Sequence, residues 1–230
     1  MSPETKASMS PEQIELHERL AILLAFVAGY MDATGIIKWK TYVSFMSGNT
    51  TQLGTSIYSE KWGIIITSAT VISCFLLGIY SGTCLALWKK IRIKTLSFFI
   101  VAGILMVYSV GSYFYEITSL LSIGIMGFSM GIMNTIVTSV GNLKVNTDFV
   151  TGTLNSLAKN AALFSMSNDK EERKVYRDNA IHLLLLWTGF VSGAIVLTIV
   201  ISPFGNWILI FPASLLLISA VWIKNSKIIL

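Results

Sequence analysis

Long uncharged runs dominate the pattern of hydrophobic and polar positions along the chain. Residues 62–88, 95–115, 117–143 and 183–223 contain no Asp, Glu, Lys or Arg. A helix needs about 20 mainly apolar residues to cross a bilayer, so the pattern predicts an all-α polytopic membrane protein. Six transmembrane helices are expected, at about 18–38, 62–88, 95–115, 117–141, 179–202 and 204–223.

Two further stretches, 41–60 and 145–166, are too polar to face lipid and too apolar to be free loops. Each contains a version of one polar phrase, "FMSGNTTQL" at 45–53 and "FVTGTLNSL" at 149–157. Non-helical backbone at membrane depth persists only when it is buried in protein or lines a wet cavity. We therefore expect two re-entrant half-helices in addition to the six spans.

Each re-entrant segment is predicted to descend as extended chain and to return as a short helix. In the first, residues 42–46 are rich in β-prone side chains, Ser47 can cap a helix, and Gly48 permits close approach. Thr151 and Gly152 are expected to play the same parts in the second. A helix N-terminus carries about half a positive charge and unpaired N–H groups. Two such ends facing each other would suit an anionic or strongly polar ligand.

The basic residues predict the orientation. If neither polar stretch crosses the membrane, 14 of the 17 Lys and Arg residues fall on one side, and Lys38, Lys40 and Lys61 fall on the other. Basic residues collect on the cytoplasmic side, so both termini are placed in the cytoplasm. The charged run 168–178 is then a solvated helix start on that side.

The polar phrases belong to a longer internal repeat. Upstream, "GYMD" (29–32) matches "GIMN" (131–134), and downstream "GIYSG" (78–82) matches "GFVSG" (189–193). Because each half holds about three spans, the second half is expected to be inverted, a plan common among secondary transporters. The expected divisions are 1–17, a cytoplasmic N-terminal tail and helix start; 18–115, the first membrane repeat; 117–224, the inverted second repeat, with the cytoplasmic loop 167–178; and 225–230, a cytoplasmic tail.

Polar residues of both halves form the predicted substrate site. The alternative is that the Ser, Thr and Gly residues only let helices pack closely. The predicted substrate-binding residues are Asp32, Ser47, Gly48, Asn49, Thr50, Asn134, Thr151, Gly152 and Thr153.

Asp32 is the one acidic residue between Leu20 and Lys38, in the first predicted span. An ionised side chain near the bilayer centre costs about 2.5–3.5 kcal/mol on insertion scales, so it normally faces a cavity or a partner. One interpretation gives Asp32 a function: it binds a cation, takes up a proton or orients the ligand. The other is structural: it caps N–H groups of the broken segment, or it pairs with Lys38 or Lys40. Asn134 occupies the matching position in the second half, which excludes a symmetric carboxylate pair.

The sequence offers no catalytic or metal-binding constellation. Cys74 and Cys84 lie about 15 Å apart on one predicted helix, too far to pair. His17 and His182 fall near predicted membrane edges and are expected to be interfacial. No phosphate-binding loop, dinucleotide fingerprint or nucleophile motif occurs. We therefore expect no enzymatic activity, no cofactor and no metal. The net charge of +5 is explained by topology rather than by nucleic-acid binding.

The motif "AGYMDATGI" followed by "FMSGNTTQLG" resembles the YoaK-like family of bacterial membrane proteins, a domain family of unknown function. The resemblance extends over about residues 18–225. It implies a multi-pass protein of the bacterial inner (plasma) membrane and names no substrate. The plan of an extended segment followed by a half-helix is also similar to that of urate, uracil and sulfate permeases, which have many more spans.

These features favour a small secondary transporter of a small polar or anionic solute, with possible proton coupling through Asp32. Two alternatives stay open: a passive small-solute channel, and a non-transporting membrane scaffold or assembly factor. The expected partners are the lipid bilayer and the solute. A homodimer is one way to shield the re-entrant segments from lipid.

Overall fold

The computed structural model describes residues 11–87, 95–136, 139–140, 143–144 and 150–225. These residues are almost wholly helical, as the uncharged runs predict. A pair of two-residue strands, β1 (Ser139–Val140) and β2 (Leu143–Lys144), is antiparallel. The helices are α1 Pro11–Trp39, α2 Met46–Tyr58, α3 Trp62–Leu87, α4 Leu96–Phe114, α5 Ser119–Met133, α6 Val150–Met166, α7 Lys170–Phe204, the 3₁₀ turn η1 Gly205–Leu209, and α8 Ile210–Asn225.

In the described part of the chain, four helical stretches are long and apolar enough to cross a membrane: Glu12–Trp39, Trp62–Leu87, Leu96–Phe114 and Lys170–Ile223. The last of these contains α7, η1 and α8. Helices occupy each of the six stretches that the sequence predicts as spans, but the fourth is shorter than expected. The sequence predicts this span over 117–141, whereas α5 begins at Ser119 and ends at Met133. At 1.5 Å per residue it is roughly 22 Å long, less than the ~30 Å hydrocarbon core.

The charged run 168–178 forms the start of α7, as predicted. Asp169 caps the helix by accepting hydrogen bonds from the N–H groups of Glu171 (2.8 Å) and Glu172 (3.4 Å). Both glutamates lie in the first turn, where negative charge complements the helix dipole. The first helix, α1, begins at Pro11, a residue type that is favoured at the first position of a helix.

Close glycine contacts hold the long helices together in two pairs. The most extensive packing is between α1 and α7 and between α3 and α5. Where α1 crosses α7, Gly29 lies on the backbone of Phe190 and Gly193 on the backbone of Phe26. Any Cβ at these positions would overlap a carbonyl group. Small residues permit this backbone approach between membrane helices.

The crossing of α3 and α5 has the same construction. Gly78 lies on the backbone of Phe128, and Gly131 lies on the backbone of Phe75. Both crossings therefore pair a glycine of each helix with a phenylalanine carbonyl of the other. The close-packing role of glycine, which the sequence offered as an alternative to a site, is confirmed for these residues.

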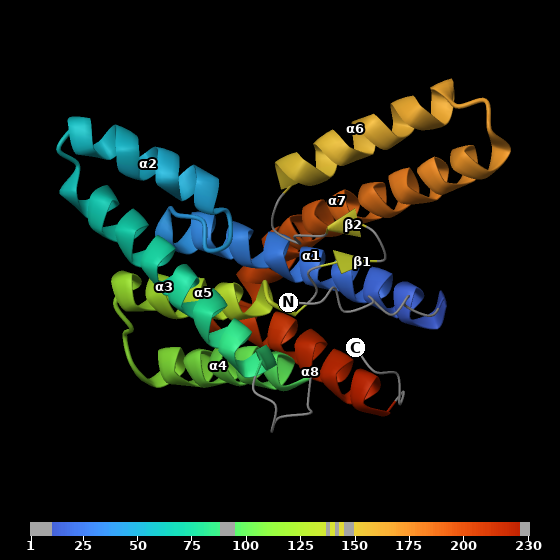
Figure 1. Ribbon diagram of the computed structural model, residues 1–230. Helices are drawn as coiled ribbons and strands as arrows, with labels where there is room; N and C mark the ends of the chain where they lie inside the picture. Colours follow the sequence, from blue (N-terminus) through green and yellow to red (C-terminus); the bar gives the residue numbers. More distant parts are fainter. Residues whose placement is uncertain (1–10, 88–94, 137–138, 141–142, 145–149, 226–230) are drawn as a thin grey trace.

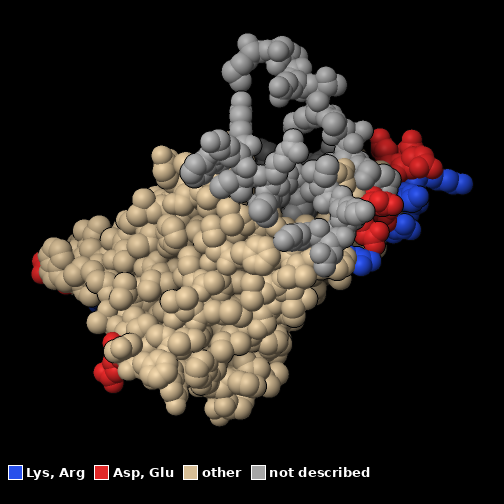
Figure 2. Space-filling model, turned by 90° about the horizontal axis from the view of Figure 1, so that it is seen from below, with Lys and Arg blue, Asp and Glu red and all other residues tan. Residues whose placement is uncertain are grey.

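Two helical hairpins extend from the centre of the molecule. Figure 1 shows α2 with α3 reaching to one side and α6 with α7 to the other, while α4 and α8 pack against each other below α1. In this view the N-terminal ends of α2 and α6 point towards each other. Figure 2 shows a face that is largely uncharged, with most of its charged side chains gathered at the end where α1 and α7 begin.

Replacing a crossing glycine will destabilise the fold. In Gly131→Leu the new side chain meets the Phe75 carbonyl, and overpacking of this kind costs about 1–3 kcal/mol or more. We expect a lower melting temperature in detergent. Gly54→Leu on α2 is the matched control, because nothing lies within 4 Å of the Cβ that would be added there. Equal melting temperatures for the two variants would contradict the close crossing.

Candidate functional site

A buried carboxylate fixes the junction between α1 and α2. Asp32 is 4% exposed and lies on α1, two turns before the helix ends. Its Oδ1 accepts hydrogen bonds from the N–H groups of Val43 (2.9 Å) and Ser44 (2.7 Å). Its Oδ2 accepts one from the Ser44 hydroxyl (2.8 Å). Hydrogen bonds to a charged acceptor are about twice as strong as neutral ones, so Asp32 holds the chain that leads into α2.

A second set of hydrogen bonds closes the same junction. Asn49 is fully buried on α2; its Nδ2 donates to the Tyr42 carbonyl (2.9 Å), and its Oδ1 accepts from the Thr41 hydroxyl (3.1 Å). The Thr41 N–H donates to the Gly35 carbonyl of α1 (3.3 Å). Several polar backbone groups between the two helices thus have partners inside the protein, as backbone at membrane depth would need.

The structural interpretation of Asp32 is correct in its capping form and wrong in its ion-pair form. Lys38 donates to the Gly205 carbonyl (3.4 Å) and Lys40 to the Ile37 carbonyl (3.4 Å). Among the described residues neither lysine forms a salt bridge with Asp32. The functional interpretation of Asp32 stays a prediction.

Two local expectations for the first re-entrant segment are wrong. Residues 40–45 bend rather than run as a strand, beginning with a left-handed φ of 59° at Lys40. The helix begins at Met46, with Phe45 in the cap position and no side-chain cap, so Ser47 is not the cap. The carboxylate of Asp32, distant in sequence, instead holds the loop just before the helix.

The predicted residues of α2 divide between the junction and the surface. Ser47 and Thr50 are exposed, and the Thr50 hydroxyl donates to the Met46 carbonyl (2.8 Å). Gly48 is half-buried beside the ring of Phe45, which a Cβ at this position would overlap. Asp32 and Asn49 therefore belong to one network, while Ser47 and Thr50 form the outer side of the first turn of α2.

The predicted residues of the second half lie on two helices. Asn134 ends α5, and its buried Oδ1 has no hydrogen-bond partner among the described residues. Thr151, Gly152 and Thr153 lie in the first turn of α6, which packs on α7; Thr151 is exposed and the other two are half-buried. Residues 145–149, which contain the expected extended segment, are outside the described residues.

Sequence reasoning missed three positions. Thr41 and Ser44 complete the junction, and both are buried. Their position in the sequence, between Asp32 and the polar phrase at 45–53, could have indicated this role. His182 was expected at an interface but is 5% exposed, with its Nδ1 4.0 Å from the Glu18 carboxylate of α1. Among the described residues, no group of three or more His, Cys, Asp or Glu side chains is placed to hold a metal ion.

Long apolar helices, a largely uncharged face and polar backbone satisfied inside the protein define an integral membrane protein. Residues 20–222 match the family described as a protein of unknown function, DUF1275, and the chain belongs to that family. It is also 26% identical over 207 residues to the UPF0700 transmembrane protein YoaK of Bacillus subtilis (strain 168), with 86% of this chain and 89% of that protein covered. No solved structure matches. The YoaK-like resemblance is confirmed.

Removing the Asp32 carboxylate will loosen the junction. In Asp32→Ala the buried N–H groups of Val43 and Ser44 lose their acceptor, at about 1–3 kcal/mol for each unsatisfied group. Asp32→Asn keeps an acceptor but loses the charge, so the melting temperature should fall in the order wild type, Asn, Ala. Hydrogen exchange over residues 41–49 should rise in the same order.

Asp178→Asn is the control for the loss of one carboxylate. Asp178 is half-exposed and pairs with Arg177 at the surface, where an ion pair contributes little. If Asp32→Asn melts and exchanges like wild type, Asp32 does not hold the junction.

Proposed function

We propose that the protein is a small secondary transporter of a small polar or anionic solute. It is built from two inverted halves with six spans and two re-entrant helices, α2 and α6. The transport role is proposed in preference to a catalytic one. Three observations support the proposal: the duplicated helix crossings, the exposed first turn of α2, and the hydrogen-bonded junction between α1 and α2.

The glycine contacts support the inverted repeat. Gly29 and Phe26 of α1 make the same contacts as Gly131 and Phe128 of α5, an offset of 102 residues. On their partner helices, Phe75 and Gly78 of α3 correspond to Phe190 and Gly193 of α7, an offset of 115. Each crossing joins a helix of one half to a helix of the other, as a two-fold axis in the membrane plane would require.

The same contacts refine the alignment of the halves. They pair Gly78 with Gly193, whereas the sequence match of 78–82 with 189–193 pairs it with Gly189. The difference is four residues, about one helical turn, so the small-residue faces coincide in both alignments. Periodicity alone does not separate two registers that differ by one turn.

The first turn of α2 is the observation that carries the proposal. No side chain accepts a hydrogen bond from the first N–H groups of this helix; Asp32 binds N–H groups of the loop before it. The N–H groups of Met46 and Asn49 donate to backbone carbonyls. The N–H groups of Ser47 and Gly48 and the helix dipole are left for a ligand. Ser47 and Thr50 add exposed hydroxyl groups there. The N-terminal end of α6, with Thr151, points towards it in Figure 1. Two positive helix ends facing each other favour an anionic or strongly polar solute.

A charge placed on this turn tests the proposal. Ser47→Asp should preserve or raise the melting temperature, because a carboxylate in a first turn complements the helix dipole. The same carboxylate should weaken binding of an anionic solute. The measurement is a thermal-shift screen against small anions, nucleobases, sugars and amino acids, since a ligand of the folded state raises the melting temperature. Uptake of each hit into proteoliposomes follows.

Thr55→Asp, on the exposed later part of α2, is the charge-matched control and should bind and transport as wild type. Uptake that saturates, and that Ser47→Asp reduces, is the expected result. Uptake that rises without saturation would favour a passive channel. A ligand response unchanged in Ser47→Asp would contradict a site at this turn.

A further inference from the structure

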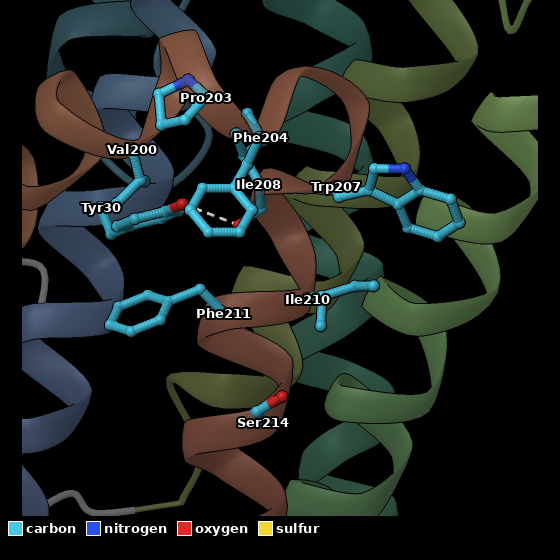
Figure 3. Close-up of a pocket in the computed structure, with 9 residues that line it drawn as sticks. All are labelled: Tyr30, Val200, Pro203, Phe204, Trp207, Ile208, Ile210, Phe211 and Ser214. Carbon is cyan, nitrogen blue, oxygen red and sulfur yellow. Dashed lines mark hydrogen bonds between the residues drawn. The ribbon is translucent and has the colours of Figure 1, made fainter.

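An apolar groove lies on the far side of α1 from the α2 junction. It has a volume of about 470 Å³ and opens where α7 turns through η1 into α8. Figure 3 shows its walls converging from α1, α7 and α8. The residues that matter below are Tyr30, Val200, Phe204, Trp207, Phe211 and Ser214.

The walls of the groove are fixed by neighbouring contacts. The Tyr30 hydroxyl donates to the Ile208 carbonyl (2.7 Å), which removes the main polar group of that wall from the groove. The Phe211 ring packs on Tyr30 with centroids 5.7 Å apart, and the Trp207 ring packs on Tyr113 at 5.2 Å. The groove is therefore a preformed apolar channel rather than a gap between loose side chains.

A cation lies beside the turn that bounds one end of the groove. Lys38, in the last turn of α1, reaches the carbonyl of Gly205, which lies between Phe204 and Trp207 in the chain. The Lys38 side chain is exposed and forms no salt bridge among the described residues. An ammonium group has three donors, and the Gly205 carbonyl takes one. Asn206 lies at the same turn, where its amide donates to the Ser112 carbonyl (3.4 Å).

The opposite end of the groove runs along α8 towards Ser214. In Figure 3 Pro203 and Phe204 lie at one end and Ser214 at the other, with Phe211 between them. The helices that form these walls belong to stretches long and apolar enough to span the membrane. The groove thus has a cationic, polar rim at a helix turn and an apolar floor that continues along a membrane helix.

We propose that the groove binds an anionic phospholipid, with one acyl chain of the lipid along α8 and the lipid phosphate at the Lys38 ammonium. The volume lies in the range of small-molecule sites. A lysine at the end of a membrane helix can pair with a lipid phosphate, because its ammonium group binds phosphate as a point charge with three donors. This site is independent of the solute site at α2.

The experiment uses the full-length protein purified in mild detergent. Native mass spectrometry counts retained phospholipid, and thermal shift records the response to added phosphatidylglycerol, phosphatidylcholine and glycerol phosphate. We expect retained anionic lipid and a rise in melting temperature with phosphatidylglycerol only. In Lys38→Gln the half-effective concentration should rise about fivefold. Lys61→Gln, which removes a lysine from the α2–α3 connection, should respond as wild type.

Val200→Trp fills the groove without touching its charged rim and should abolish the phosphatidylglycerol response. Folding of each variant is checked by its melting temperature without lipid. An equal response to phosphatidylcholine, a response to glycerol phosphate alone, or an unchanged Lys38→Gln would overturn the proposal. So would a Val200→Trp protein that still responds, or a lipid-free dimer that Val200→Trp dissociates, since the occupant would then be a second copy.

Discussion

The hydrogen bonds between the Asp32 carboxylate and the N–H groups of Val43 and Ser44 are the constraint on which the first half of the fold depends. The chain leaves α1, bends and starts a second helix within a few residues. Such a bend exposes polar backbone that lipid cannot satisfy. One carboxylate supplies acceptors for three donors, and the Asn49 amide donates to the Tyr42 carbonyl and accepts from the Thr41 hydroxyl. The backbone that leads from α1 into α2 therefore has hydrogen-bond partners inside the protein.

The glycine crossings place this junction at the centre of the molecule. Because Gly29 lies on the Phe190 backbone, α1 and α7 approach closely three residues before Asp32 on α1. The equivalent crossing of α3 and α5 ends near Asn134. Each polar position thus follows a close helix contact, where the backbone is held rigidly. A polar group in such a place has its geometry set by the helices on both sides.

The sequence predicts most of the helices because long uncharged runs indicate segments that lie in lipid. The unequal distribution of Lys and Arg indicates which side faces the cytoplasm. It predicts that Asp32 needs a partner, because an isolated charge at that depth is costly. It does not identify Val43 and Ser44 as the partners, since that choice depends on a bend that begins at the left-handed Lys40. Ser47 fits a local cap by its type, yet α2 has no side-chain cap, and the loop before it is held by Asp32 through tertiary contact.

The burial of His182 and the early end of α5 escape sequence reasoning for a related reason. A histidine near the end of an apolar run looks interfacial, and only the packing of α1 against α7 encloses it. An uncharged run does not show where its helix stops. The last residue of α5 is Met133, and Asn134, a neutral amide, takes the C-cap position. Helix type is thus readable from composition, whereas helix ends depend on neighbours.

The difference between Asp32 and Asn134 constrains the proposed transport cycle. Two inverted halves that exchange access would be expected to move alike if their junctions were alike. A carboxylate held by three donors resists rearrangement more strongly than a neutral amide, because its hydrogen bonds are charge-assisted. The α2 junction is then the fixed reference in the cycle. Movement should concentrate in the hairpin of α6 and α7, whose polar counterpart, Asn134, carries no charge and whose buried oxygen has no donor among the described residues.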